Sequence, residues 1–159
     1  MKFSKKSRYG VAALIDLAVN SKNGHVALGS IAERNEISPQ YLEQVFASLR
    51  RAGIVKSVKG SQGGYLLKYP SSSITVASII QALEGTYYLD DEETKTEESA
   101  AGIAETIQED IVDRVNHGLD QILQNLTLAD LEESFQERQS GGQEMYYICL
   151  LYTSDAADE

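Results

Sequence analysis

Cysteine, proline and tryptophan are scarce in this chain of 159 residues, which contains one Cys, two Pro and no Trp. A single Cys cannot form an internal disulfide framework, and it cannot by itself build a zinc or iron-sulfur site. No apolar run approaches the roughly 20 residues needed to span a bilayer, and the start leads into an amphipathic segment rather than an apolar signal core. We therefore expect a cytoplasmic protein with no membrane partner.

Hydrophobic residues make up 42% of the chain, enough for a packed core, but the formal net charge of −10 is unevenly divided. Residues 1–70 carry eleven Lys and Arg against four Asp and Glu, a net charge of +7. Residues 71–159 carry three against twenty, a net charge of −17. A basic module joined to an acidic one favours nucleic-acid contact by the first and assembly or sensing by the second.

The first part of the chain has the pattern of two helices joined by a loop. Apolar residues at helical spacing predict a helix over residues 4–20. Ser30 and Glu33 form a capping-box pattern, which predicts that a short helix begins at Ser30 and ends near Asn35.

Ser38 followed by Pro39 predicts the start of a longer helix, which Gly53 closes. A short helix, a tight turn and a longer helix follow one another in helix-turn-helix proteins. The buried stripe of this longer helix is expected to consist of Leu42, Val45, Phe46 and Leu49. Its outward face then carries Gln40, Gln44, Ala47 and Arg51, flanked by Tyr41 and Glu43. These side-chain types can contact base edges or phosphates, although an outward polar face alone is more often simply solvated.

Residues 54–58 and 65–67 are β-prone runs joined by a glycine-rich segment, which predicts a hairpin. Directly after a recognition helix, such a hairpin is the wing of a winged helix-turn-helix, where Lys56 and Lys59 could reach phosphates or the minor groove. A phosphate-binding loop is the competing interpretation of the glycines. It is disfavoured because neither nucleotide-binding glycine motif is present and no helix follows immediately.

Residues 74–83 predict a short helix, capped near Ser73 and Thr75 and stopped by Gly85, that closes the core of the first domain. Residues 86–101 are acidic and without periodicity, so we expect a flexible loop. Clustered carboxylates could bind a hard cation, but the spacing of a calcium-binding loop is missing and a solvated loop is favoured.

A long apolar stripe follows the acidic segment. Its members recur every three or four residues and are Ile103, Ile107, Ile111, Val115, Leu119, Ile122 and Leu126. A helix this long must bury its stripe, either across the core of its own domain or against a second copy, and its length favours a dimer contact. Thr127 and Asp130 then predict another turn or two of helix, followed by a flexible segment over residues 136–142.

Four motifs carry a family resemblance: residues 7–10 (Ser-Arg-Tyr-Gly), 37–44, 49–55 and 59–65. With them, the chain resembles the Rrf-two family of winged-helix repressors over about residues 1–148. The resemblance implies a homodimer that binds double-stranded DNA at an inverted-repeat operator, with the helix after Ser38 in the major groove and Lys59 in the minor groove. The expected DNA-contacting set is Lys2, Lys5, Arg8, Tyr9, Ser38, Gln40, Tyr41, Glu43, Gln44, Arg51, Lys56, Lys59 and Ser61.

The same resemblance also has an implication for cofactors. Members that hold an iron-sulfur cluster carry three Cys in the loop after the domain-closing helix, and residues 86–101 contain none, which implies no cofactor. This pattern and the ending at residues 145–148 are more similar to the cluster-free branch, which represses cysteine and sulfur metabolism together with a cysteine synthase. Ser7 departs from the Gly found in many members. His25 and His117 lack partners at metal spacing and are interpreted as structural.

The fold class expected is therefore mainly α with a small β-hairpin wing and a long dimerisation helix. The domains are residues 1–85 for DNA binding, 86–101 as an acidic loop and 102–148 for dimerisation. Residues 149–159 have no family counterpart and are expected to be non-native, so Cys149 carries no role. The alternative to a DNA-binding repressor is a protein-interaction adaptor on the same scaffold. An enzyme is disfavoured because no set of nucleophile, base and orienting residue is found.

Overall fold

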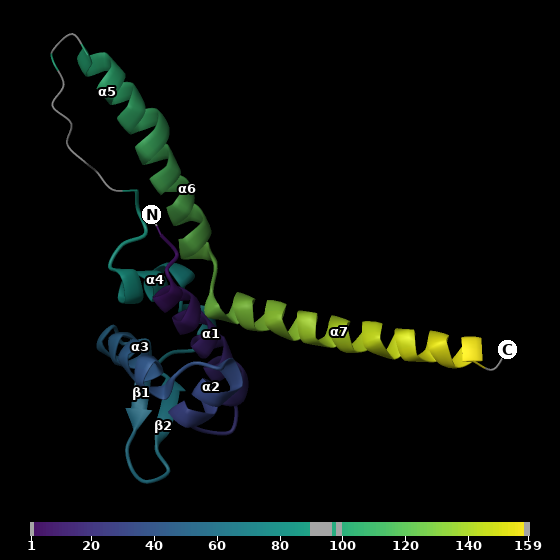
Figure 1. The fold of residues 1–159 in the computed structure, drawn as a ribbon. Coiled ribbons are helices and arrows are strands. Elements are labelled where there is room, and N and C mark those ends of the chain that lie inside the picture. Colours follow the sequence, from purple (N-terminus) through teal and green to yellow (C-terminus); the bar gives the residue numbers. More distant parts are fainter. Residues whose placement is uncertain (1, 90–96, 98–99, 158–159) are drawn as a thin grey trace.

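Helices dominate the architecture, and the described residues contain one small hairpin (Figure 1). The computed structural model describes residues 2–89, 97 and 100–157. The first elements are α1 (Lys5–Asn20), α2 (Leu28–Asn35), α3 (Pro39–Arg51), β1 (Val55–Val58), β2 (Gly64–Leu67), the 3-10 turn η1 (Ser71–Ser73) and α4 (Val76–Glu84). The later elements are α5 (Ala101–Ile107), the π-helical segment η3 (Gln108–Asp113), α6 (Arg114–Asn125) and α7 (Leu128–Ala157). The predicted fold class is confirmed.

Side-chain caps fix the starts of several helices. The predicted caps at Ser38 and Thr75 are confirmed, because their hydroxyls accept from the backbone N–H of Tyr41 and Ser78, each at 3.1 Å. The prediction for α2 is wrong, since the helix begins at Leu28 without a side-chain cap and encloses Ser30. The backbone N–H of Ser30 already donates to the carbonyl of Ala27 at 3.1 Å, so the first turn closes before the predicted cap.

The main hydrophobic core lies among α1, α2, α3 and α4. All four residues of the predicted buried stripe of α3 are fully buried, as are Leu14 and Leu17 of α1 and Ile31 of α2. Each such side chain contributes roughly 1.5–3 kcal/mol by leaving water. This core holds α2 and α3 in the helix-turn-helix arrangement, with Glu36 in the turn in a left-handed conformation, φ 54°.

The hairpin is antiparallel, with Val55 opposite Leu67 and Val58 opposite Gly64. It is fixed to the body by Val26, which exchanges backbone hydrogen bonds of 3.0 and 2.8 Å with Tyr65. Gly64 is needed at this crossing, because a Cβ there would lie 2.3 Å from the carbonyl oxygen of Val26. The wing therefore has a defined orientation relative to α3.

Helix α4 has two buried faces. Ile79 and Leu83 complete the main core, as predicted, while its other face forms a second cluster with α6. This second cluster joins Val76, Ala77, Ile80 and Tyr87 to Leu119, Leu123, Leu126 and Leu131. Leu119 and Leu126, which the sequence assigns to the dimer contact, therefore pack against α4 of their own chain.

Residues 86–89 differ from the predicted flexible loop. Tyr87 is 2% exposed, and its hydroxyl and that of Tyr88 donate to the carboxylate of Asp120 on α6. The backbone N–H of Leu89 donates to Asn116 Oδ1 at 2.8 Å. This segment is therefore anchored on α6, and residues 90–96, 98 and 99 of the predicted loop lie outside the described residues.

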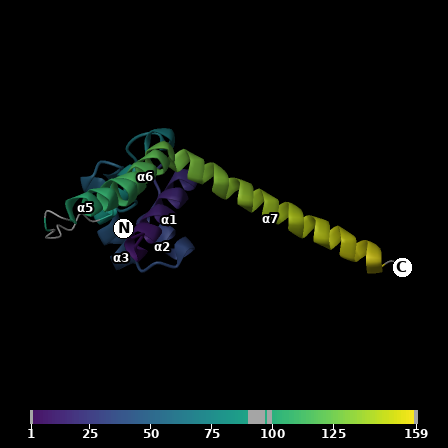
Figure 2. The same ribbon diagram turned by 90° about the horizontal axis from the view of Figure 1, so that it is seen from above.

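Helix α7 begins where the sequence predicts, because the Thr127 hydroxyl accepts from the backbone N–H of Asp130 at 3.2 Å. The prediction of a flexible segment over residues 136–142 is wrong, because α7 continues without interruption to Ala157. Strong helix formers such as Gln136, Glu137 and Arg138 outweigh the two glycines that follow. Two views show α7 projecting from the body (Figures 1 and 2). Across the described ranges, every helix is too short or too polar to cross a membrane.

Candidate nucleic-acid interface

The outward face of α3 is open to solvent. Gln40, Glu43, Gln44 and Arg51 are exposed, Ala47 is half-buried, and the opposite face of the helix is locked in the core. A helix held by its apolar face and free on a polar face has the geometry needed to enter a major groove. The side chains that the sequence predicts as base readers therefore share one accessible surface.

The first turns of α1 lie beside the start of α3. Tyr9 packs edge-on against Tyr41, with ring centroids 5.7 Å apart and an interplanar angle of 84°. The Lys5 ammonium lies 5.4 Å from the Tyr9 ring centroid, and Lys2 and Arg8 are exposed nearby in sequence. A cavity of about 260 Å³ lies at this junction and is lined by Lys5, Tyr9, Glu36, Ile37, Ser38 and Tyr41. The structure thus brings two predicted groups of site residues together.

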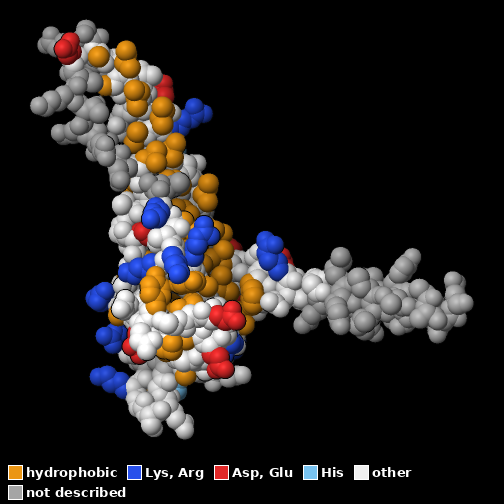
Figure 3. Space-filling model, viewed as in Figure 1, with side chains coloured by type: hydrophobic (Ala, Val, Ile, Leu, Met, Phe, Trp, Pro, Cys, Tyr) orange, Lys and Arg blue, Asp and Glu red, His pale blue; other side chains and the backbone are white. Residues whose placement is uncertain are grey.

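Lys56, Lys59 and Ser61 are all exposed on the wing, whose strands contact both α3 and α1. His25 braces its tip, because the ring Nε2 lies 2.5 Å from the carbonyl oxygen of Gln62. This role for His25 agrees with the structural interpretation of that residue. Lys and Arg side chains follow one edge of the body from the N-terminal end to the hairpin (Figure 3).

Lys6 is a basic residue of this surface that the predicted set leaves out. Its ammonium lies 3.4 Å from the Ser48 hydroxyl, and the Arg51 guanidinium donates to the same oxygen at 3.2 Å. The signal in the sequence was the basic run at residues 2–8, but only the fold places Lys6 against α3. Lys6 therefore belongs with Arg51 on the candidate surface.

The cations of this surface have no carboxylate partners among the described residues. Among the described residues, the ion pairs join Lys22 to Glu132 at 2.8 Å and Arg34 to Asp16 at 2.7 Å. None of these four residues belongs to the predicted DNA-contacting set. Positive charge that is not neutralised internally is available to phosphate groups. The surface can therefore bind a polyanion.

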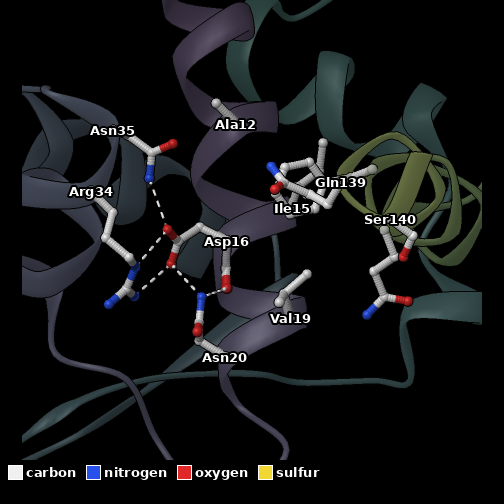
Figure 4. A pocket seen from close by; sticks show the side chains of 11 residues that line it. Ala12, Ile15, Asp16, Val19, Asn20, Arg34, Asn35, Gln139 and Ser140 are labelled. Atoms are coloured by element: carbon white, nitrogen blue, oxygen red, sulfur yellow. Dashed lines mark hydrogen bonds and ion pairs between the residues drawn. The ribbon is translucent and has the colours of Figure 1, made fainter. Parts of the chain in front are cut away.

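A groove of about 1020 Å³ between α1 and α7 is a feature that the sequence did not predict (Figure 4). At its edge, Asp16 accepts from Arg34 at 2.7 and 2.9 Å and from Asn35 at 3.0 Å. The hydrogen bond to Asp16 is the main cause that raises the pKa of Arg34. This network clamps α2 to α1 and is satisfied internally.

A row of apolar side chains along α5, η3 and α6 is exposed (Figure 3). Its members are Ile103, Ile107, Ile111, Val115 and Ile122, with exposed fractions between 39% and 66%. An extended apolar row on a soluble surface marks an interaction site. Its use as a dimer contact remains a prediction.

The fold, and the basic surface formed by α3, the first turns of α1 and the wing, define a winged helix-turn-helix protein. Residues 3–134 match the sequence profile of the Rrf2 (Rrf-two) family, described as iron-dependent transcriptional regulators. The transcriptional regulator IscR of Yersinia enterocolitica is 38% identical over 135 residues, covering 82% of this chain and 79% of the relative. The chain belongs to the Rrf2 family and is a DNA-binding transcriptional regulator.

Two solved structures place the chain near the IscR and CymR members of the family. CymR, the global cysteine regulator of B. subtilis, is 36% identical with a TM-score of 0.71, covering 84% of this chain and 98% of that structure. IscR of T. potens is 40% identical with a TM-score of 0.62, covering 87% and 91%.

The family description raises the question of an iron cofactor. An iron-sulfur cluster needs several cysteine thiolates, and this sequence has one Cys in total, Cys149. Within the described part of the chain, no three His, Cys, Asp or Glu side chains are grouped so that they could hold a metal ion. The thiol content of the chain therefore does not fit an iron-sulfur cluster.

Proposed function

We propose that the protein is a dimeric, sequence-specific repressor of cysteine and sulfur metabolism genes that acts without an iron-sulfur cluster. The observation that carries the DNA-binding part is the exposed polar face of α3, together with cations of α1 and of the wing that have no carboxylate partner among the described residues. The sulfur-metabolism part is supported by the similarity to CymR and by the shortage of thiols.

In this proposal the contacts divide into two kinds. Lys2, Lys5, Arg8 and Lys59 dock the protein on phosphates, with Lys59 at the wing tip entering the minor groove. Gln40, Glu43 and Gln44 read base edges, since Gln can pair with adenine and Glu can accept from cytosine. The other members of the set orient α3 or contact the DNA backbone. They are Tyr9, Ser38, Tyr41, Arg51, Lys56 and Ser61.

The first experiment is selection of binding sites from random DNA duplexes, followed by a salt titration with the selected site. A dimer is expected to enrich a pseudo-palindrome, with affinity falling steeply as salt rises. If no sequence is enriched, the selection is repeated with a cysteine synthase present. Failure in both conditions would favour the protein-interaction adaptor.

Two variants separate docking from base reading. Lys59→Ala should weaken binding to all duplexes and reduce the salt slope by about one contact, whereas Gln44→Ala should mainly reduce preference for the selected site. Arg138→Ala is the matched control, because Arg138 is exposed on α7 and its loss removes one positive charge far from the wing. If all three variants behave alike, the groove-docking arrangement is wrong.

The metabolic signal is proposed to come from a partner. Addition of a cysteine synthase should change affinity for the selected site, and O-acetylserine should modulate that change. An operator affinity that is unaffected by the synthase would remove the partner from the proposal and leave the DNA-binding function intact.

A further inference from the structure

The carboxylate of Glu84, at the end of α4, lies at the N-terminus of α1, although the two segments are far apart in sequence. Glu84 Oε1 accepts from the backbone N–H of Ser4 at 3.2 Å and from the Ser7 hydroxyl at 2.7 Å. It also contacts the Ser4 hydroxyl. Ser7 is fully buried and Glu84 is half-buried.

The position of Glu84 suits α1 better than its own helix. A negative charge is unfavourable at the C-terminal end of α4 and favourable at the N-terminal end of α1. Helix α1 has no acidic residue in its own first turn. Glu84 therefore supplies to α1, from another element, the charge that usually comes from the first turn of the helix.

The contact between α1 and α4 is also close. A Cβ added at Gly10 would lie 2.3 Å from Leu83 Cδ1, so the glycine lets the Leu83 side chain pack directly on the backbone of α1. On its other side α4 packs against α6 through the second cluster. The placement of the first turns of α1, with Lys5 and Arg8, relative to α6 therefore depends on this joint.

We propose that Glu84 is a positioning residue for DNA binding: through Ser4 and Ser7 it fixes the DNA-contacting end of α1 against α4 without touching DNA. This inference rests on the proposed DNA-binding function. It also gives Ser7 a purpose, since a Gly at that position has no hydroxyl to donate to the carboxylate.

Positioning and simple electrostatics predict opposite results for removal of Glu84. Loss of a negative charge near Lys2 should, by charge alone, tighten binding to every duplex and steepen its salt dependence. Loss of a positioning contact should weaken binding to the selected site and flatten the salt dependence, because the phosphate contacts of α1 are lost. The sign of the change therefore separates the two explanations.

The test measures affinity and salt slope of full-length wild type, Glu84→Ala, Glu84→Gln and Ser7→Ala, on the selected site and on an unrelated duplex. We expect Glu84→Ala to lose roughly tenfold on the selected site and to bind the unrelated duplex more weakly as well, with a smaller salt slope on both, because phosphate contacts do not depend on sequence. Glu84→Gln keeps an acceptor oxygen and should retain most of the affinity. Glu137→Gln, on exposed α7, is the control for loss of one negative charge.

Ser7→Ala should reproduce the loss more weakly and keeps the inference testable if Glu84→Ala does not fold. A folded Glu84→Ala, or Ser7→Ala in its place, that binds the selected site as tightly as wild type with an unchanged salt slope would overturn the positioning role. Failure of the wild-type protein to select any site would instead overturn the proposed function, so the two failures are distinguishable.

Discussion

At the scale of single residues, Glu36 stores backbone strain in the helix-turn-helix. Its φ of 54° is the one positive value among the described non-glycine residues. A side chain in this left-handed region costs roughly 1–2 kcal/mol, which the packing of α2 and α3 must offset. Glycine adopts the same conformation without the Cβ clash but loses more entropy on folding.

Glu36→Gly is therefore expected to raise the free energy of unfolding by roughly 0.5–1 kcal/mol. Urea denaturation followed by circular dichroism would measure the gain. The control is Glu33→Gly, on the body of α2, which should lose roughly 1 kcal/mol because glycine is a poor residue inside a helix. A loss at Glu36→Gly would show that the turn is not strained.

The Glu84 carboxylate also predicts a pH dependence of stability. Hydrogen bonds from Ser4 and then Ser7 hold the pKa of Glu84 below its usual 4.5. A lowered pKa in the folded state means that the stabilisation is fully present above the unfolded pKa and is lost as the pH falls through the folded pKa.

The difference in free energy of unfolding between wild type and Glu84→Gln should therefore favour wild type at pH 7 and shrink below about pH 4.5. Denaturation at a series of pH values would show this. A difference that stays constant down to pH 3 would indicate that the charge of Glu84 contributes nothing.

At the scale of elements, the segment after α4 is joined to α6 by a polar cluster. Burial, and then the hydrogen bond to Asp120, raise the pKa of Tyr87 to about 12. The hydrogen bonds from Tyr87 and Tyr88 in turn lower the pKa of Asp120. Because the pKa of Tyr87 is raised in the folded state, the contribution of this cluster to the free energy of unfolding is fully present below pH 10 and is lost as the pH rises toward 12.

Tyr87→Phe should lower the free energy of unfolding by roughly 1–2 kcal/mol, because it leaves Asp120 without one of its donors. Amide hydrogen exchange should show faster exchange at Leu89, whose N–H donates to Asn116 in the same cluster. Tyr69→Phe is the control, since Tyr69 is 55% exposed. Equal stabilities for the two variants would mean that the cluster does not anchor the segment.

The elements that could be predicted are those whose signals are local. Ser38 with Pro39, Thr75 and Gly85 mark helix ends by chemistry that acts within one turn, and the structure confirms them. The placement of Tyr87 on Asp120 depends on side chains 33 residues apart, for which the sequence has no periodic signal. The candidate interface divides in the same way, because the face of α3 follows from helical spacing but the position of Lys6 follows from packing.

The long helix shows how a local irregularity serves an extended pattern. Ile103, Ile107, Ile111 and Val115 recur every four residues, and in an α-helix each such step turns about 40° past a full rotation. The π-helical segment Gln108–Asp113 holds more residues per turn and so counters this drift. The exposed apolar row therefore stays on one side of the helix, which periodicity alone did not predict.

At the scale of the whole molecule, the basic end and the acidic end perform separate tasks in our proposal. The first 70 residues carry a net charge of +7 and the remainder −17. Repulsion between DNA and the acidic part favours an orientation in which the basic part faces the DNA and the acidic part faces away from it. Helix α4 packs on both α1 and α6, so packed helices join the DNA-contacting end to the helix that carries the exposed apolar row.

The exposed apolar row leads to the last prediction, that it pairs two copies. Ile107→Glu combined with Ile111→Glu should convert a dimer to a monomer in sedimentation velocity, because charge would be buried on both sides of a symmetric contact. Affinity for an inverted repeat should fall far more than affinity for a single half-site, since two linked readers bind with an effective concentration that one reader lacks. Glu109→Gln, on the same helix but outside the row, should change neither. A double variant that remains a dimer with full affinity for the inverted repeat would place the dimer contact elsewhere, and the groove between α1 and α7 would be the next surface to substitute.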